Sequence, residues 1–204
     1  VVVLEAAQLP MLRALGPGVA ARLVEAHRAR GVEVRTGVGV AGFRGRGVVE
    51  RVELADGTHV PTELVVVGVG MAPDTALAAA AGLEVGDGVH VDGSGRTSNP
   101  AVWAAGDVAA VTGPDGARPR SEHWQNAKDG GAALARSVLG IDPAPAAVPW
   151  FWSDQYDLDI QLAGHPRPDD ARVWRGDPEA MSFAVLHHRS GVLTGITAVN
   201  RGKD

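Results

Sequence analysis

The stretch over residues 96–107, RTSNPAVWAAGD, constrains the fold of this chain more than any other. It has the pattern of an extended segment with a proline, then a short apolar strand that ends in Gly106 and Asp107. Glycine has no Cβ, so Gly106 permits close approach of a ligand to the backbone. An ionised carboxylate only accepts hydrogen bonds, so Asp107 suits a ligand hydroxyl at the carboxyl end of a strand, where open α/β sheets bind ligands. The alternative is that Asp107 caps the next element, and the four residues AAGD alone leave both interpretations open.

Composition narrows the class of protein only broadly. The 204 residues suffice for one large domain or two small ones with a buried core. Lys and Arg number 19 and Asp and Glu 24, a net charge of −5 at pH 7, which is not the basic footprint of a nucleic-acid-binding protein. No apolar run approaches the roughly 20 residues that cross a bilayer, and no signal-peptide pattern opens the sequence. The lack of cysteine excludes disulfides and thiolate metal sites within these residues. We therefore expect a cytoplasmic α/β protein.

The beginning of the chain has the pattern of a β-α-β unit. Residues 1–4 form a short continuous apolar run, which is typical of a strand buried on both faces. A helix is expected from Pro17 to Arg30, with Gly31 as its stop signal. A second strand is expected over residues 32–35 and completes the unit.

Glu5 directly follows the first of these strands. In a dinucleotide-binding fold, an acid at the tip of the second strand binds the adenine ribose hydroxyls and disfavours a 2′-phosphate. The G-x-G-x-x-G loop that should precede such an acid by about 20 residues is not in this sequence, which begins at the strand itself. On these residues alone, Glu5 is an ordinary charge at the end of a strand.

Short strands with turn signals between them come next. We expect strands over 38–43 and 48–54, and a buried strand over 64–67. The segment Gly68-x-Gly70-x-x-Pro73 that follows is half of a phosphate-binding fingerprint, but its third glycine is absent. A turn from strand to loop is therefore the better interpretation of Gly70 than a phosphate loop.

The second half of the chain changes from helix to strand. A short alanine-rich helix is expected over 74–82, and residues 122–139 have helical spacing, with Trp124 on the apolar stripe. A proline-marked linker runs from Ile141 to Pro145. Short strands then follow over 150–152, 158–163, 172–174, 182–188 and 192–199.

In the C-terminal part after the linker, the tryptophans are expected to pack in the core and the histidines are not expected to bind a metal. We expect Trp150 and Trp152 to pack in the core of this section. His187 and His188 are adjacent in a strand and should point to opposite faces, so they do not form a metal-binding pair. The other histidines are scattered, and we expect no metal site.

Three motifs together resemble a known family. The pattern T-S-x-P-x-x-x-A-A-G-D that ends at Asp107 resembles the second FAD-binding motif of the two-dinucleotide-binding flavoprotein reductases. The sequences EHWxxA from Glu122 and PWFWSDQY from Pro149 narrow the resemblance to the NADH-dependent ferredoxin reductases, within the FAD-dependent pyridine nucleotide-disulfide oxidoreductases. The resemblance runs from the first residue to the last, and it implies a chain that is cut at both ends.

The resemblance implies a fold class and a division into three parts. The fold would be α/β, a partial two-dinucleotide-binding-domain flavoprotein with a small α+β C-terminal reductase domain. The NAD-binding domain would cover 1–73, the second segment of the FAD-binding domain 74–141, and the C-terminal domain 142–204.

The resemblance also assigns roles in binding FAD and NAD. Asp107 would bind the ribityl hydroxyls, with Gly106 allowing close approach, and Glu5 would hold the adenine ribose of NADH. Gly70 would lie near the nicotinamide, at the crossover between domains. The N-terminus of the helix that begins at Glu122 would point its partial positive charge at the flavin pyrimidine edge.

Residues at the start of that helix have competing interpretations. By the resemblance, Trp124 lies by the isoalloxazine, and Glu122 and His123 belong to the same site. The alternatives are that Trp124 packs in the core and that Glu122 and His123 are first-turn residues that face water.

The function that the resemblance implies is transfer of electrons from NADH through FAD to a [2Fe-2S] ferredoxin, which feeds a cytochrome P450 or a dioxygenase. No nucleic acid and no membrane are expected as partners, and a dimer is compatible with the family. Two alternatives stay open. One is an NADH oxidase or an apoptosis-inducing-factor-like reductase, and the other is a fragment that holds no cofactor and has no catalytic activity.

Overall fold

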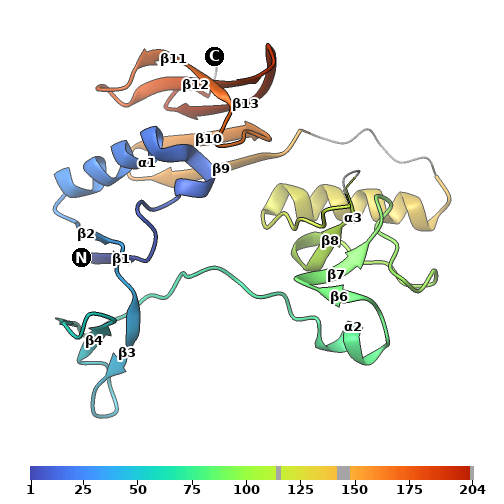
Figure 1. Cartoon of the computed structure of the whole chain (residues 1–204), viewed down its shortest axis with the longest axis horizontal. Helices are drawn as coiled ribbons and strands as arrows, with labels where there is room; N and C mark the ends of the chain where they lie inside the picture. The colour runs from blue at the N-terminus through green and yellow to red at the C-terminus, as the bar shows by residue number, and fades with distance from the viewer. Residues whose placement is uncertain (114–115, 142–147, 203–204) are drawn as a thin grey trace. The chain divides into compact units, whose positions relative to one another are not determined.

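The computed structural model describes residues 1–113, 116–141 and 148–202 (Figure 1). The chain divides into two compact units, Val1–Val69 and Gly70–Asp204. This boundary falls in the segment where the sequence predicts a crossover between domains. The predicted linker from Ile141 to Pro145 lies, apart from Ile141, outside the described residues. The predicted domain boundary between residues 141 and 142 therefore stays a prediction.

The first unit begins with the predicted β-α-β arrangement. Strand β1 (Val2–Glu5) pairs in parallel with β2 (Glu33–Thr36), and helix α1 (Leu12–Ala29) connects them. Gly16 interrupts the helix with a φ of 71°, so regular helix begins at Pro17 as predicted, because the fixed φ of proline suits a first helical position. One face of the helix is buried and includes Val19, Leu23 and Val24.

An antiparallel meander completes the ordered part of this unit. Its strands β3 (Val40–Arg44), β4 (Arg51–Leu54) and β5 (His59–Pro61) lie in the order β3-β4-β5. Their small core consists of Val52, Leu54 and Val60. The two strands predicted over 38–43 and 48–54 are thus confirmed, with shorter bounds.

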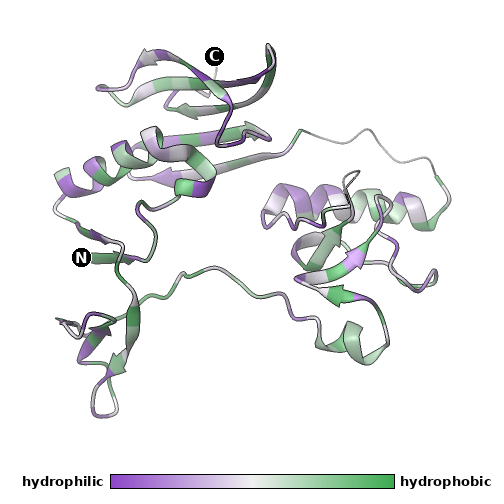
Figure 2. Ribbon diagram, viewed as in Figure 1, coloured by the Kyte–Doolittle hydropathy of each residue, from purple (hydrophilic) through white to green (hydrophobic). Residues whose placement is uncertain are grey.

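The prediction of a buried strand over 64–67 is wrong. The segment has no strand structure, and the exposed fractions of Leu64, Val66 and Val67 are 77%, 88% and 60%. The segment is apolar in sequence, as the hydropathy colouring in Figure 2 shows. A strand needs a neighbour to pair its backbone groups, and within the described residues β1 and β2 pair only with each other. Of the four residues 64–67, Val65 is the one that packs against the core of the meander.

The second unit opens with a small sheet and one long helix. A short helix α2 (Ala76–Ala80) leads into β6 (Val85–Gly86), which pairs with β7 (Gly88–Val91). A 3₁₀ turn η1 (Gly106–Val108) then leads into β8 (Ala109–Val111), parallel to β7, and α3 (Trp124–Val138) follows.

The last part of the chain is a five-stranded antiparallel sheet in the order β11-β12-β13-β10-β9. All five predicted strands are present, and the turn between β12 and β13 has Ser190 and Gly191 at positive φ, which suits a tight hairpin turn. The largest fully buried side chains include Phe183, Ile160 and Val199. The bounds are β9 (Trp150–Gln155), β10 (Leu158–Gly164), β11 (Ala171–Asp177), β12 (Ser182–Arg189) and β13 (Val192–Val199).

The prediction that Trp150 and Trp152 pack in the core of this sheet is wrong. Their exposed fractions are 37% and 41%. The buried Ile160 pairs with Ser153, whereas Trp152 pairs with Gln161. Since side chains alternate between faces along a strand, the two tryptophans lie on the face opposite the core.

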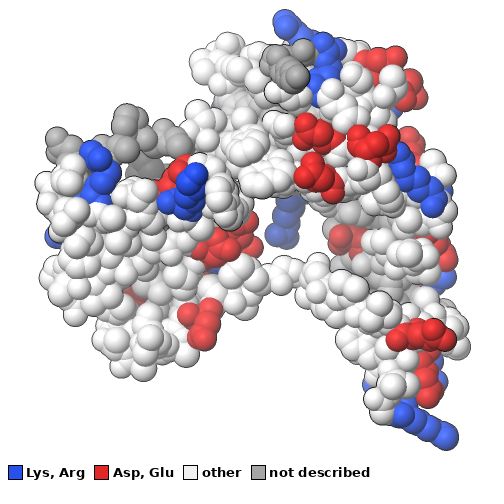
Figure 3. All heavy atoms as spheres, turned by 180° about the vertical axis from the view of Figure 1, so that it is seen from behind, with Lys and Arg blue, Asp and Glu red and all other residues white. Residues whose placement is uncertain are grey.

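Charged residues of both signs are interspersed on the face in Figure 3. Among the described residues, no helix is long and apolar enough to cross a membrane. Within the same residues, no group of three His, Cys, Asp or Glu side chains is placed to hold a metal ion.

Candidate flavin site

The predicted FAD motif forms a turn that precedes a strand. Arg96 and Trp103 make one isolated bridge, and Asp107 lies in η1, ahead of β8. The prediction of a strand that ends at Gly106 is therefore wrong. The backbone hydrogen bonds are made locally, because Thr97 N donates to Val102 O at 3.0 Å and the Thr97 hydroxyl donates to the same oxygen at 2.9 Å.

Helix α3 packs against this turn at small residues. Gly106 has a φ of 76°, and a Cβ there would lie 3.6 Å from the Cβ of Ala127. A Cβ at Gly130 would lie 3.8 Å from the backbone nitrogen of Gly106. These distances are ordinary contacts, so the glycines bring the first half of the helix close to the turn.

Asp107 carries an unpaired buried oxygen. Its Oδ1 atom is buried and has no hydrogen-bond partner among the described residues, while its main-chain carbonyl accepts a hydrogen bond from Arg120 Nη1 at 3.0 Å. A buried acceptor without a partner is unfavourable, and each such atom in a folded protein calls for an explanation. A ligand hydroxyl would supply the missing donor, so the residues of this turn fit the ribityl chain of FAD.

The N-terminus of α3 is capped by His123. The ring Nδ1 accepts a hydrogen bond from the backbone nitrogen of Asn126 at 3.1 Å, and the Asn126 side chain donates to Ser121 O at 2.8 Å. The helix therefore begins one residue after His123, and Glu122 lies just outside it. His123 thus acts as a cap, a role that sequence analysis did not assign to it.

Arg120 is the main residue of this site that sequence analysis missed. Its side chain is 7% exposed, and Nη2 lies 3.0 Å from Asp87 Oδ1 and 2.6 Å from Glu122 Oε1. The hydrogen bond to Asp87, together with the charges of Asp87 and Glu122, raises the pKa of the Arg120 guanidinium. The sequence shows an arginine two residues before Glu122, and this was the only signal for a role of Arg120. No sequence pattern indicates that Asp87 lies beside Arg120.

Three tryptophans form an exposed aromatic cluster that joins α3 to β9. The rings of Trp124 and Trp152 meet edge to face at 6.2 Å, and those of Trp150 and Trp152 stack at 4.8 Å. Lys128 Nζ lies 5.0 Å from the centre of the Trp124 ring. Trp124 is 61% exposed, so the alternative that it packs in a core does not hold in this structure.

The other two predicted site residues belong to other parts of the chain. Glu5 is at the end of β1 in the first unit, where its Oε1 accepts a hydrogen bond from Ala7 N at 2.7 Å. Gly70 is the first residue of the second unit and has a φ of 93°, and among the described residues only its chain neighbours come within 4 Å of a Cβ built there. The structure thus brings together Gly106, Asp107, Glu122, His123 and Trp124, all from the second unit.

The parallel β-α-β unit, the meander and the glycine-acid turn define a nucleotide-binding α/β fold of the flavoprotein reductase class. Residues 1–131 match the family described as pyridine nucleotide-disulphide oxidoreductase, and residues 150–204 match the reductase C-terminal family. The chain belongs to the pyridine nucleotide-disulphide oxidoreductase family.

Similar proteins agree with this family. The chain is 42% identical over 209 residues to the 5,5′-dehydrodivanillate O-demethylase ferredoxin reductase subunit of Sphingobium sp., covering 100% of this chain and 50% of that protein. A ferredoxin reductase for the CYP199A2 system from Rhodopseudomonas palustris is 37% identical with a TM-score of 0.90, covering 98% of this chain and 50% of that one. Putidaredoxin reductase in its covalent complex with putidaredoxin is 33% identical with a TM-score of 0.92, covering 98% of this chain and 49% of that one. This chain therefore spans about half the length of the relatives it matches.

Proposed function

We propose that this chain is part of an FAD-dependent reductase that passes electrons from NADH to a [2Fe-2S] ferredoxin, which serves a cytochrome P450 or a dioxygenase. The observation that carries the proposal is the match of the whole chain to a ferredoxin reductase subunit at 42% identity. Two features of the motif turn support the proposal: Gly106 packs on α3, and Asp107 Oδ1 is buried without a hydrogen-bond partner in the described part of the chain.

The residues around the motif turn would hold the flavin. When bound, FAD supplies the redox chemistry by taking two electrons from NADH and releasing them singly. Asp107 accepts hydrogen bonds from the ribityl hydroxyls, and Gly106 leaves room for the chain to approach. The capped N-terminus of α3 would contribute a partial positive charge toward the pyrimidine edge, and Trp124 would shield one side of the ring system. Glu122 and His123 act in this arrangement by fixing where the helix begins.

The first unit would hold NADH. Glu5 lies at the end of β1 and already accepts one backbone hydrogen bond there, from Ala7 N. Its second oxygen is the proposed acceptor for the adenine ribose hydroxyls, as the acid does in dinucleotide-binding folds. Gly70, where a built Cβ would meet no atom of the described residues within 4 Å apart from its chain neighbours, is proposed to lie against the nicotinamide.

The domain division follows from the same proposal. Residues 1–73 belong to the NAD-binding domain, 74–141 to the FAD-binding domain and 142–204 to the C-terminal domain. A cytoplasmic location and a dimer stay predictions, which cell fractionation and sedimentation would test.

The test uses a chimera because the chain spans half of its relatives. Residues 1–204 are joined to the part of the Sphingobium reductase subunit that the match does not cover. We expect a flavin absorption spectrum that bleaches with NADH, and rapid reduction of an added [2Fe-2S] ferredoxin. Asp107→Ala should weaken FAD binding about tenfold or more, since a lost hydrogen bond to a charged group costs about 1.5–3 kcal/mol.

The electron acceptor distinguishes a ferredoxin reductase from an NADH oxidase. Consumption of oxygen that exceeds the reduction of ferredoxin would favour an NADH oxidase. A chimera that folds by circular dichroism but holds no flavin would contradict the FAD-binding role. The visible spectrum of the 204-residue chain alone, with its intact mass measured, decides whether the chain holds flavin without the other half.

A further inference from the structure

Arg120 connects the chain just before α3 to two segments that are distant in sequence. Nη1 donates to the main-chain carbonyl of Asp107 at 3.0 Å. Nη2 lies 3.0 Å from Asp87 Oδ1, in the turn between β6 and β7, and 2.6 Å from Glu122 Oε1, just before α3. One side chain therefore ties the motif turn, the small sheet and the start of the helix together.

The shape of this contact requires arginine. A guanidinium offers five N–H donors in a rigid plane, whereas a lysine ammonium is a single point charge on a flexible stem. The backbone also leaves room for the arginine stem. Gly88 has a φ of 113°, and a Cβ there would lie 2.6 Å from Arg120 Cδ and 2.7 Å from Val108 O.

Burial makes the contact costly to lose. The Arg120 side chain is 7% exposed, and within the described ranges its Nε is buried without a hydrogen-bond partner. A buried charge is stable only when opposite charges and hydrogen bonds compensate the loss of water. Asp87 and Glu122 provide that compensation, so removal of the arginine would leave two carboxylates near each other and the Asp107 carbonyl without its donor.

We propose that Arg120 is a positioning residue, which holds the Gly106–Asp107 turn and the start of helix α3 in the arrangement that ligand binding requires. It acts through Asp107 and does not itself contact the ligand. By holding the main-chain carbonyl of Asp107, it sets the direction of that residue's carboxylate. By pairing with Glu122, it fixes the approach of the chain to the His123 cap.

Arg118 provides a matched control. It lies two residues earlier in the same loop, and its side chain is 41% exposed. It contacts His90 Nδ1 through Nη1 at 2.6 Å and the Thr112 hydroxyl through Nε at 3.3 Å. It touches neither the motif turn nor the start of α3 in these contacts, so its loss should leave both unchanged.

The first experiment measures amide hydrogen exchange in the 204-residue chain, with the variants Arg120→Met, Arg120→Lys and Arg118→Met. We expect Arg120→Met to speed exchange about tenfold over 104–111 and 121–127, because a local opening is favoured when its contacts are removed. Arg120→Lys should recover only part of this protection. Peptides over 182–199 should exchange as in the unchanged chain, and Arg118→Met should alter neither region.

Two results would overturn the proposal. If Arg120→Met exchanges like Arg118→Met over 104–111, Arg120 does not hold the turn. If exchange rises equally over 182–199, Arg120 supports the stability of the whole unit and does not position the site.

The consequence for the ligand rests on the proposed function, and a second readout separates the two. In the chimera described above, Arg120→Met should raise the dissociation constant for FAD about tenfold and shift the flavin absorption maximum, with partial rescue by Arg120→Lys. An unchanged dissociation constant and spectrum would contradict a positioning role. If no variant, including the unsubstituted chimera, binds FAD, the proposed function fails while the hydrogen-exchange result still decides whether Arg120 holds the turn.

Discussion

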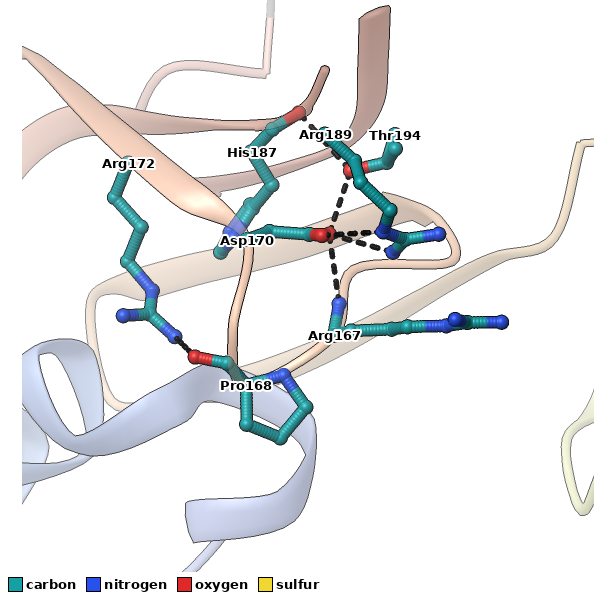
Figure 4. A network of polar contacts seen from close by, with 7 residues as sticks. All are labelled: Arg167, Pro168, Asp170, Arg172, His187, Arg189 and Thr194. Carbon is teal, nitrogen blue, oxygen red and sulfur yellow. Dashed lines mark hydrogen bonds and ion pairs between the residues drawn. The ribbon is translucent and has the colours of Figure 1, made fainter.

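The guanidinium of Arg189 faces the carboxylate of Asp170 edge to edge, with Nε 2.7 Å from Oδ1 and Nη2 2.9 Å from Oδ2 (Figure 4). Oδ2 also accepts from the Thr194 hydroxyl at 2.7 Å and from Arg167 N at 2.9 Å. Asp170 is 4% exposed, so a fully paired carboxylate joins the loop before β11 to the β12–β13 hairpin. The hydrogen bond from Arg189 lowers the pKa of Asp170 well below its usual range.

This pair predicts acid sensitivity of the C-terminal sheet. A lowered folded-state pKa stabilises the fold above the unfolded value of 3.8, and the contribution is lost as the pH falls below it. We expect the thermal unfolding temperature, followed by circular dichroism, to fall steeply below pH 4. Asp170→Asn should unfold at a lower temperature at pH 7 and show a shallower dependence over the same acid range. Equal pH dependence in both proteins would contradict the prediction.

Phe183 anchors the core of the same sheet. It is fully buried, and the ring of Trp174 lies 5.1 Å from it. Phe183→Ala should lower the free energy of unfolding by about 3–5 kcal/mol, since it removes apolar burial and leaves a cavity. Val192→Ala is the control, because Val192 is 65% exposed and its loss should cost about 0.5 kcal/mol or less. Urea denaturation measures both, and similar losses would place the core elsewhere.

Substitutions at two glycines distinguish the energetic cost of backbone strain from the cost of steric overlap. Both Gly164 and Gly191 have positive φ, but only Gly164 lies against backbone, where a Cβ would overlap Thr194 O and lie 2.8 Å from Gly195 Cα. Gly191→Ala should cost about 1–2 kcal/mol for the left-handed conformation alone. Gly164→Ala should cost about 1–3 kcal/mol more through overpacking. Equal losses in the free energy of unfolding for the two variants, measured by chemical denaturation, would mean that β10 and β13 adjust to the added Cβ at Gly164.

The edge-to-face contact of Trp124 with Trp152 should couple α3 to the C-terminal sheet. A double-mutant cycle with Trp124→Ala and Trp152→Ala is expected to give a coupling of about 0.5–1.5 kcal/mol. Trp152→Phe serves as the control, because it keeps an aromatic ring at this position and should retain most of the coupling. Additive losses in urea denaturation would show that the two rings stabilise their elements independently.

Glu5 offers a test of cofactor selection that leaves its local structure intact. In the chimera, Glu5→Gln keeps an acceptor for the Ala7 backbone nitrogen but removes the charge. We expect the dissociation constant for NADH to rise about tenfold, while that for NADPH changes less, because a charge-assisted hydrogen bond to the ribose is weakened. Glu33→Gln, on the neighbouring strand β2, is the matched control and should leave both constants unchanged. Unaltered NADH binding in Glu5→Gln would remove this residue from the proposed site.

Much of the fold could be predicted because it depends on local patterns. Pro17 and Gly31 mark the limits of regular helix in α1, and Gly191 forms the predicted hairpin turn. The candidate site was also predicted in part, since Gly106 and Trp124 belong to motifs of fixed spacing. The strand at 64–67 failed because apolar composition does not supply a pairing partner, and its side chains are exposed here.

By itself the sequence determined the β-α-β unit, two strands of the meander and the five C-terminal strands, because each depends on residue periodicity or short spacing. The motif residues also carried the resemblance to the family. Only the tertiary structure decided that Arg120 is buried between Asp87 and Glu122, and that Trp150 and Trp152 lie opposite the core. Alternation along β9 puts the two tryptophans on one face, but the register with β10 decides which face is buried. The pairing of Arg120 with Asp87 and the register of β9 with β10 join residues that are separated in the chain, and no local pattern specifies them.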